Sequence, residues 1–228
     1  MKKAALVLLL AGTAVLLYVA ARQYAGNRLY GKYERLRGGG TAAIIDDFDR
    51  LEAALAGAVR AWKNPDFHRA LGRLYLDRAL AEDKLGEPAR RDEFLDKAAA
   101  ALVESIRRNP LDSWAYFDLG AVWTLVNAPL FTYADKGRRY MRRALELNPA
   151  HEALNLRALS LFLGQWNMLD AAEKAFVKAR LERKWREKPA FIGLLRRQWI
   201  QEAKTDAGLR AVLMSDKDLW NRIGGNFR

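Results

Sequence analysis

Apolar residues recur along most of this chain at intervals of three and four, which is the spacing of one face of an α-helix. Before Pro65 the apolar stripe consists of Leu51, Leu55, Val59 and Trp62. From Pro65 onward the stripe continues in helix-length blocks that are separated by glycine, asparagine or proline, residues that begin or end helices. The pattern therefore predicts an all-α fold.

The blocks group into about three helix pairs. The expected pairs are 65–85 with 91–108, 114–127 with 133–147, and 152–163 with 168–188. A helix within 41–64 is expected to cap the first pair, and helices with a tail in 190–228 to cap the last, because the ends of a stack of pairs need a polar outer face. A basic amphipathic element lying on a membrane or a partner is the alternative for 190–228.

A small-large-small triplet marks the second helix of each pair. It occurs as Ala98, Leu102 and Ser105, as Gly137, Met141 and Ala144, and as Ala172, Phe176 and Ala179. Residues three and four apart share a helix face, so two small side chains allow a neighbouring helix to approach while the large one fills the gap. The first two copies are followed by Asn109-Pro110 and Asn148-Pro149. Repetition with a period near 40 residues is typical of a helical solenoid.

The middle pair resembles a tetratricopeptide repeat (TPR). The resemblance rests on Tyr116, Leu119-Gly120 and Trp123, followed by the run ALELNP at 144–149. His68, Leu71-Gly72 and Tyr75 repeat the first half of the motif, and Leu156, Leu159-Ser160 and Leu163 give a weaker copy. Successive prolines are 45 (Pro65 to Pro110) and 39 (Pro110 to Pro149) residues apart, against about 34 in a standard repeat. The resemblance covers 65–189 and implies an α-solenoid that binds other macromolecules.

The resemblance also implies a binding groove, because the first helices of TPR units line a concave face. The positions carried over are Arg69, Arg73, Asp77, Trp114, Phe117, Asp118, Ala121, Leu125, Arg157, Leu161 and Gln165. Aromatic residues and arginine often anchor interfaces, and arginine grips carboxylates, so an extended or helical segment with apolar and acidic residues is the expected partner. Phe117 and Ala121 replace the Lys and Asn of the carboxylate-clamp subtype. The alternative is that Trp114 and Phe117 pack under neighbouring helices.

The N-terminal region predicts a membrane signal-anchor. Residues 1–3 are basic, and 4–21 are apolar and uncharged; as a helix, 4–21 measures about 27 Å, close to the hydrocarbon thickness of a bilayer. A cleaved signal is the alternative, since Val19 and Ala21 suit a signal peptidase. Residues 22–40 are expected to form a basic stalk that ends in a triple-glycine hinge. Tyrosines 18, 24, 30 and 33 are expected either in the headgroup layer or in packing contacts.

The orientation in the membrane has two competing signals. Five basic residues follow the span at positions 22, 28, 32, 35 and 37, which favours a cytoplasmic domain by charge counting in short loops. A basic start that leads directly into an apolar run is typical of export signals, and long domains translocate despite flanking charge. We expect a single-pass protein of the bacterial inner membrane with a periplasmic domain.

The composition and charge of the chain limit which ligands, metal sites and catalytic residues can be expected. The net charge is +12, but no nucleic-acid-binding motif accompanies it, so an acidic partner or an anionic lipid or glycan is expected rather than nucleic acid. The chain has no cysteine, and its two histidines, His68 and His151, stand at a packing position and in a turn. Asp46, Asp47 and Asp49 suit a helix N-terminus better than a metal site. No catalytic residue, metal or cofactor is predicted.

These observations predict a membrane-anchored adaptor or scaffold that binds a protein partner, and not an enzyme. The resemblance to small anchored repeat proteins implies a bacterial envelope assembly, such as polysaccharide biosynthesis or export, a pilus or a secretion machine. The alternative is a basic module that binds anionic glycan or lipid headgroups.

Overall fold

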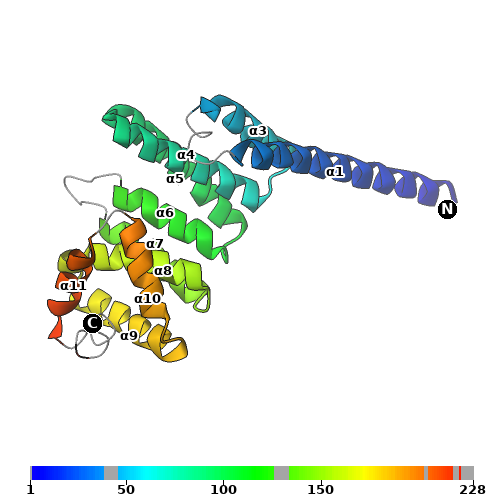
Figure 1. Ribbon diagram of the computed structural model, residues 1–228. Helices are drawn as coiled ribbons and strands as arrows, with labels where there is room; N and C mark the ends of the chain where they lie inside the picture. The colour runs from blue at the N-terminus through cyan, green and yellow to red at the C-terminus, as the bar shows by residue number, and fades with distance from the viewer. Residues whose placement is uncertain (1, 39–45, 126–133, 203–204, 218–220, 222–228) are drawn as a thin grey trace. The chain divides into compact units, whose positions relative to one another are not determined.

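The computed structural model describes residues 2–38, 46–125, 134–202, 205–217 and 221, and within these residues every regular element is helical (Figure 1). The chain divides into two units, 1–141 and 142–228, which we describe separately. The first unit holds α1 (Lys2–Arg37), α3 (Phe48–Ala61), α4 (Pro65–Leu85), α5 (Pro88–Arg108), α6 (Ser113–Leu125) and the start of α7 (Ala134–Leu147). The second holds the end of α7, α8 (Glu152–Gly164), the 3-10 turn η1 (Trp166–Met168), α9 (Ala171–Glu187), α10 (Phe191–Gln201) and α11 (Asp206–Met214).

The helix boundaries agree closely with the expected ones and follow from local capping chemistry. Asn64 caps α4, where its side chain accepts a hydrogen bond from the Asp66 amide at 2.9 Å. Gly86 ends α4 with a φ of 77°, a left-handed conformation that favours glycine. Pro88 begins α5 instead of staying in the turn, because proline is tolerated in the first turn of a helix. Residues 126–133, between α6 and α7, lie outside the described part.

One core unites α3 to α6 with the second half of α1. It includes Tyr33, Leu51, Leu55, Leu74, Leu95, Leu102 and Leu119, each at most 1% exposed. In the first two helix pairs, a glycine on the first helix meets the large residue of the triplet on the second helix. A Cβ atom added to Gly72 would lie 2.6 Å from Leu102 Cγ, and one added to Gly120 would lie 2.6 Å from Met141 Cγ. The first two triplets are therefore packing faces, as predicted.

The third triplet does not form such a face. Ala172 and Ala179 are exposed and Phe176 is only half-buried, whereas Val177 and Leu181 of the same helix are completely buried. The prediction that all three residues of this triplet form a packing face is therefore wrong, although the Phe176 ring lies 6.3 Å from the Phe162 ring of α8. In the second unit α8 packs chiefly with α10 and α11. The small residues of the α9 triplet are therefore not needed for a close contact between helices.

Ser160 illustrates this departure from the repeat pattern. It occupies the place of the repeat glycine on α8, and its side chain is completely buried. Its hydroxyl donates to the Glu202 carboxylate, which follows α10, at 2.6 Å. A residue that would be a glycine in a helix pair of the TPR type thus holds α8 against the end of α10.

Restoring the repeat glycine is expected to destabilise the second unit. Ser160→Gly should lower the free energy of unfolding by about 2 kcal/mol, because a hydrogen bond to a charged group is lost and a glycine enters a helix interior. Ser160→Ala keeps the helix propensity and should lose only the hydrogen bond, so it should be less damaging. Urea denaturation of both variants measures the difference, and a Ser160→Gly variant as stable as the natural chain would contradict the assignment.

The second half of α1 belongs to the first unit. A Cβ atom added to Gly26 would lie 2.8 Å from Trp62 Cβ, and one added to Gly57 would lie 3.1 Å from Leu29 Cδ1, so α1 and α3 approach closely at two points. Tyr33 is completely buried, and Tyr30 stacks on Phe67 with ring centroids 5.0 Å apart. The expected stalk is helical, but it packs against the fold instead of standing apart from it.

The first half of α1 projects from this contact (Figure 1). The stretch Val7–Arg37 is long and apolar enough to cross a membrane, with a mean hydropathy of 1.5 over its most apolar window and none of that window buried. Tyr18 and Tyr24 lie on this exposed side, at 62% and 69% exposure, unlike Tyr30 and Tyr33. A signal sequence has the same character, so both alternatives stated for residues 4–21 stand.

Candidate functional site

The residues of the predicted groove are divided between the two units. Arg69, Arg73 and Asp77 lie on α4, and Trp114, Phe117, Asp118, Ala121 and Leu125 on α6, all in the first unit. Arg157 and Leu161 lie on α8, and Gln165 follows that helix, in the second unit. Within the first unit the structure brings the α4 and α6 residues into direct contact through ion pairs. The side chain of Leu125 lies outside the described part.

Four charged side chains, three of them from the predicted groove, form an ion-pair ladder across α1, α4 and α6. Arg37 lies 3.8 Å from Asp77, the Arg73 Nε lies 3.0 Å from Asp77 Oδ1, and the Arg73 Nη1 donates to Asp118 Oδ1 at 2.8 Å. Asp118 is only 5% exposed. Burial raises the pKa of its carboxyl group, although the neighbouring Arg73 opposes this shift. The ladder therefore supplies the counter-charge that the Asp118 carboxylate needs.

Arg69 is also paired within the chain. Its guanidinium lies 3.5 Å from Asp112 Oδ2 and 3.6 Å from Asp66 Oδ1. Asp112 has a second role, because its Oδ1 accepts hydrogen bonds from the amides of Trp114 at 3.0 Å and Ala115 at 3.2 Å, in the first turn of α6. Two of the three groove arginines that were expected to grip a partner's carboxylates, Arg69 and Arg73, thus already hold carboxylates of their own chain.

The expected aromatic centre of the groove is largely enclosed. Trp114 and Phe117 meet edge to face with ring centroids 5.6 Å apart. Trp114 is half-buried, Phe117 is 4% exposed, and Ala121 packs against the core of the first unit. The burial of Phe117 fits the alternative in which it packs under neighbouring helices. In the second unit Arg157 is exposed, while Leu161 and Gln165 are half-buried.

The titratable residues considered for chemistry have structural surroundings. His151 caps α8 through its Nδ1, which accepts from the Leu154 amide at 3.3 Å. His68 is buried, and this burial, with the nearby Arg108, lowers its pKa. As expected, Asp47 and Asp49 lie at the N-terminus of α3, as its N-cap residue and in its first turn. Asp47 makes no side-chain cap bond and pairs with Arg50 at 3.0 Å instead. Among the described residues no group of three or more His, Asp or Glu side chains is arranged to hold a metal ion.

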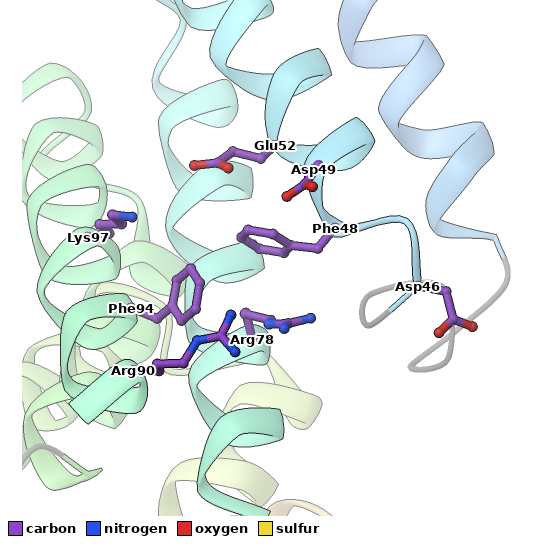
Figure 2. A pocket seen from close by; sticks show the side chains of 8 residues that line it. All are labelled: Asp46, Phe48, Asp49, Glu52, Arg78, Arg90, Phe94 and Lys97. Atoms are coloured by element: carbon purple, nitrogen blue, oxygen red, sulfur yellow. The ribbon is translucent and has the colours of Figure 1, made fainter. Parts of the chain in front are cut away.

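A cleft that the sequence did not indicate lies between α3, α4 and α5 (Figure 2). It has a volume of about 340 Å³ and is lined by Asp46, Phe48, Asp49, Glu52, Arg78, Arg90, Phe94 and Lys97. Phe48 and Phe94 form its floor, edge to face at 5.2 Å, and Arg78 lies over the Phe48 ring at 5.2 Å. We name this site the aromatic cleft. No motif in the sequence singles out Phe48 and Phe94.

The aromatic cleft carries both signs of charge on separate sides. Figure 2 shows the three carboxylates coming from the α3 side and the three cations from α4 and α5. Arg78 pairs with the completely buried Glu82 at 2.6 Å, which fixes it over the floor. Arg90 and Lys97 are 57% and 43% exposed and stand at the rim, where Arg90 lies 3.6 Å from Glu82 and Lys97 lies 2.7 Å from Glu93.

One carboxylate of the cleft is oriented by a partly buried hydrogen bond. The Tyr75 hydroxyl donates to Glu52 Oε1 at 2.6 Å. Burial of the phenol, followed by this hydrogen bond, raises the pKa of Tyr75, so it stays a proton donor at physiological pH. The Glu52 carboxylate is therefore held in one position on the α3 side.

Comparison with models of known protein families gives no match, and no curated protein matches the chain.

Proposed function

We propose that this chain is a membrane-anchored adaptor built from TPR-like helix pairs, and that it holds a protein partner in the aromatic cleft. In this proposal residues 4–21 cross the inner membrane of a bacterium, and the domain faces the periplasm. The resemblance to small anchored repeat proteins favours an envelope assembly as the setting, such as polysaccharide biosynthesis or export, a pilus or a secretion machine. The chain would act by recruitment and would run no reaction of its own.

The mixed charge of the aromatic cleft carries this proposal. Phe48 and Phe94, each 8% exposed, form a largely buried apolar floor, while Arg90 and Lys97 offer exposed cations on one side. A polypeptide segment can present an apolar side chain to the floor and a carboxylate to the cations at the same time. Aromatic anchors with arginine beside them are typical of protein interfaces, and complementary charges select the partner.

The same charges disfavour an anionic polymer in this cleft. A uniformly anionic glycan would meet Arg90 and Lys97, but also the carboxylates of Asp46, Asp49 and Glu52 on the facing side. Like charges brought together cost binding energy, whereas a partner with separated charges avoids that cost. Arg73 and Arg69 add no anion site beside the cleft, because they are paired within the chain and only 29% and 32% exposed, against 57% for Arg90 and 43% for Lys97.

Site-specific crosslinking tests the proposal. A photoreactive residue at position 96, beside the rim cation Lys97, is introduced into the full-length chain in its own cell envelope, and the crosslinked species are identified by mass spectrometry. We expect one prominent protein partner. Arg90→Glu with Lys97→Glu should reduce the crosslink by about tenfold, because two attractive charges become repulsive at the rim.

A matched variant separates the cleft from general surface charge. Arg139 and Arg183 are exposed and each pairs with an acid four residues away, as Lys97 does. Arg139→Glu with Arg183→Glu makes the same charge change outside the cleft and should leave the crosslink intact. An unchanged crosslink in the cleft variant, or an equal loss in both variants, would reject the cleft as the partner site. A crosslink to carbohydrate that disappears at moderate salt would favour a polymer ligand instead.

A further inference from the structure

The contact between α1 and α3 places three separate segments at the point where the apolar part of α1 ends. Arg22 is the first residue after the uncharged stretch 4–21. Its Nε donates to the Ala61 carbonyl at 2.7 Å, and its Nη2 donates to the Arg60 carbonyl. The end of α3 and the turn that follows it therefore lie at the level of residue 22.

The C-terminal end of α5 lies at the same level as the end of α3. The Arg108 Nη1 donates to the Lys63 carbonyl at 3.3 Å, which holds the last turn of α5 against the turn between α3 and α4. Residues far apart in the sequence thus meet around the base of the projecting helix. We name this group the basic collar. It consists of Arg22, Arg60, Lys63, Arg107 and Arg108.

The basic collar keeps a positive excess after its own ion pairs are counted. Glu104 is the carboxylate that pairs with Arg107 and Arg108, at 2.7 and 2.6 Å, and Asp66 pairs with Arg69. The side chains of Arg60 and Lys63 are exposed, whereas their carbonyls serve the contacts with α1 and α5. The half-buried Trp62 stands between them against Gly26, and tryptophan is enriched at the membrane–water boundary.

We propose that the basic collar binds anionic phospholipid headgroups of the membrane that α1 crosses. This inference rests on the proposed membrane span of residues 4–21. If that span fills the hydrocarbon layer, residues 60–63 lie at headgroup depth, because Arg22 follows the span directly and contacts them. Each lysine or arginine near an anionic surface strengthens binding, and long basic side chains extend to the headgroups. A site at headgroup depth favours a lipid ligand over a soluble glycan.

Lipid retention by the full-length chain tests the collar. The chain is purified in detergent mixed with equal amounts of phosphatidylglycerol and phosphatidylcholine, and native mass spectrometry counts the lipids that stay bound. We expect a preference for phosphatidylglycerol in the natural chain. Arg60→Gln with Lys63→Gln should reduce that preference by roughly tenfold or more, since two headgroup charges are lost. The variant should stay folded, because only the backbone carbonyls of these residues make the contacts described.

Arg50→Gln with Lys84→Gln is the matched control. It removes the same charge at the other ends of α3 and α4, about 15 Å and 30 Å along these helices from the collar. This control should keep the lipid preference. Equal retention of both lipids by the natural chain, an unchanged preference in the collar variant, or an equal loss in both variants would overturn the proposal.

A separate measurement distinguishes failure of the collar from failure of the membrane span. Alkaline carbonate extracts peripheral proteins and leaves spanning proteins in the membrane. Extraction of the natural chain would reject the span and the collar together. Resistance to extraction without a lipid preference would reject the collar alone, and neither result depends on the crosslink at the aromatic cleft.

Discussion

Replacing Gly120 with valine is expected to lower the free energy of unfolding by about 3 kcal/mol, the upper end of the range for overpacking a core. Even a single Cβ atom at this position would lie 2.6 Å from Met141 Cγ, 2.8 Å from the Gly137 carbonyl oxygen and 3.1 Å from the Met141 amide nitrogen. Met141 can change rotamer, but the Gly137 and Met141 backbones belong to α7 and move only if the helix moves. The substitution should therefore force α6 and α7 apart. Urea denaturation of the full chain in detergent measures the change.

Gly31 provides the matched control for this substitution. It lies within α1 of the same unit, and a Cβ atom added there meets nothing within 4 Å. Gly31→Val should change the free energy of unfolding by less than about 0.5 kcal/mol, because valine has only a slightly better helix propensity than glycine. If both variants lost stability equally, the close approach of α6 and α7 would not be what Gly120 provides.

The helix pairs of the first unit could be predicted because local rules and packing agree there. Asn64 and Gly86 mark helix ends through capping and backbone preference, and the first two triplets face glycines on the preceding helices. The capping residues lie within a few residues of the helix ends that they specify. Element boundaries in this part of the chain therefore follow from the sequence alone.

The second unit shows where that reasoning fails. The triplet on α9 has the right spacing, yet Ala172 and Ala179 are exposed because α8 packs with α10 and α11. A single helix sequence reveals which face is small, but not which neighbour covers it. Ser160 carried the relevant signal, since a serine in place of the repeat glycine indicates a different contact, here the Glu202 carboxylate.

The ion-pair ladder, the aromatic cleft and the basic collar could not be predicted from the sequence, for a related reason. The TPR pattern places Arg73 and Asp118 on one face, but it does not reveal that they pair with each other at 2.8 Å. The aromatic cleft and the basic collar each combine three segments that are distant in the chain. The cleft depends on how α3 packs against α4 and α5. The collar depends on how α1 packs against α3, which the expected stalk and hinge did not anticipate.

Arg73→Ala is expected to lower the free energy of unfolding by about 3–5 kcal/mol at neutral pH, because removing one partner of a buried ion pair leaves the other charge without compensation. The partner is Asp118, which is 5% exposed and lies 2.8 Å from the lost guanidinium. Arg73 also links Asp118 to Asp77, so its removal leaves two carboxylates near each other without the cation between them. Urea denaturation followed by circular dichroism measures the loss.

The pH dependence of this loss identifies its cause. Burial raises the pKa of Asp118 in the folded chain, and loss of Arg73 should raise it further above the unfolded value of about 4. A group with a raised folded pKa contributes stability below its unfolded pKa and loses that contribution as the pH rises through the folded pKa. The deficit of Arg73→Ala should therefore be smallest near pH 4 and grow toward pH 7.

Asp118→Asn separates the buried charge from simple packing. The amide keeps the shape of the side chain and needs no counter-charge, so Arg73→Ala combined with Asp118→Asn should be more stable at pH 7 than Arg73→Ala alone, by about 1.5–3 kcal/mol. Measured against Asp118→Asn alone, the deficit of the double variant should also stay constant between pH 4 and pH 7, because Asp118 titrates in neither chain. A deficit that is independent of pH in Arg73→Ala itself, with no rescue by Asp118→Asn, would mean that Arg73 stabilises the first unit through its aliphatic contacts and not through the ion-pair ladder.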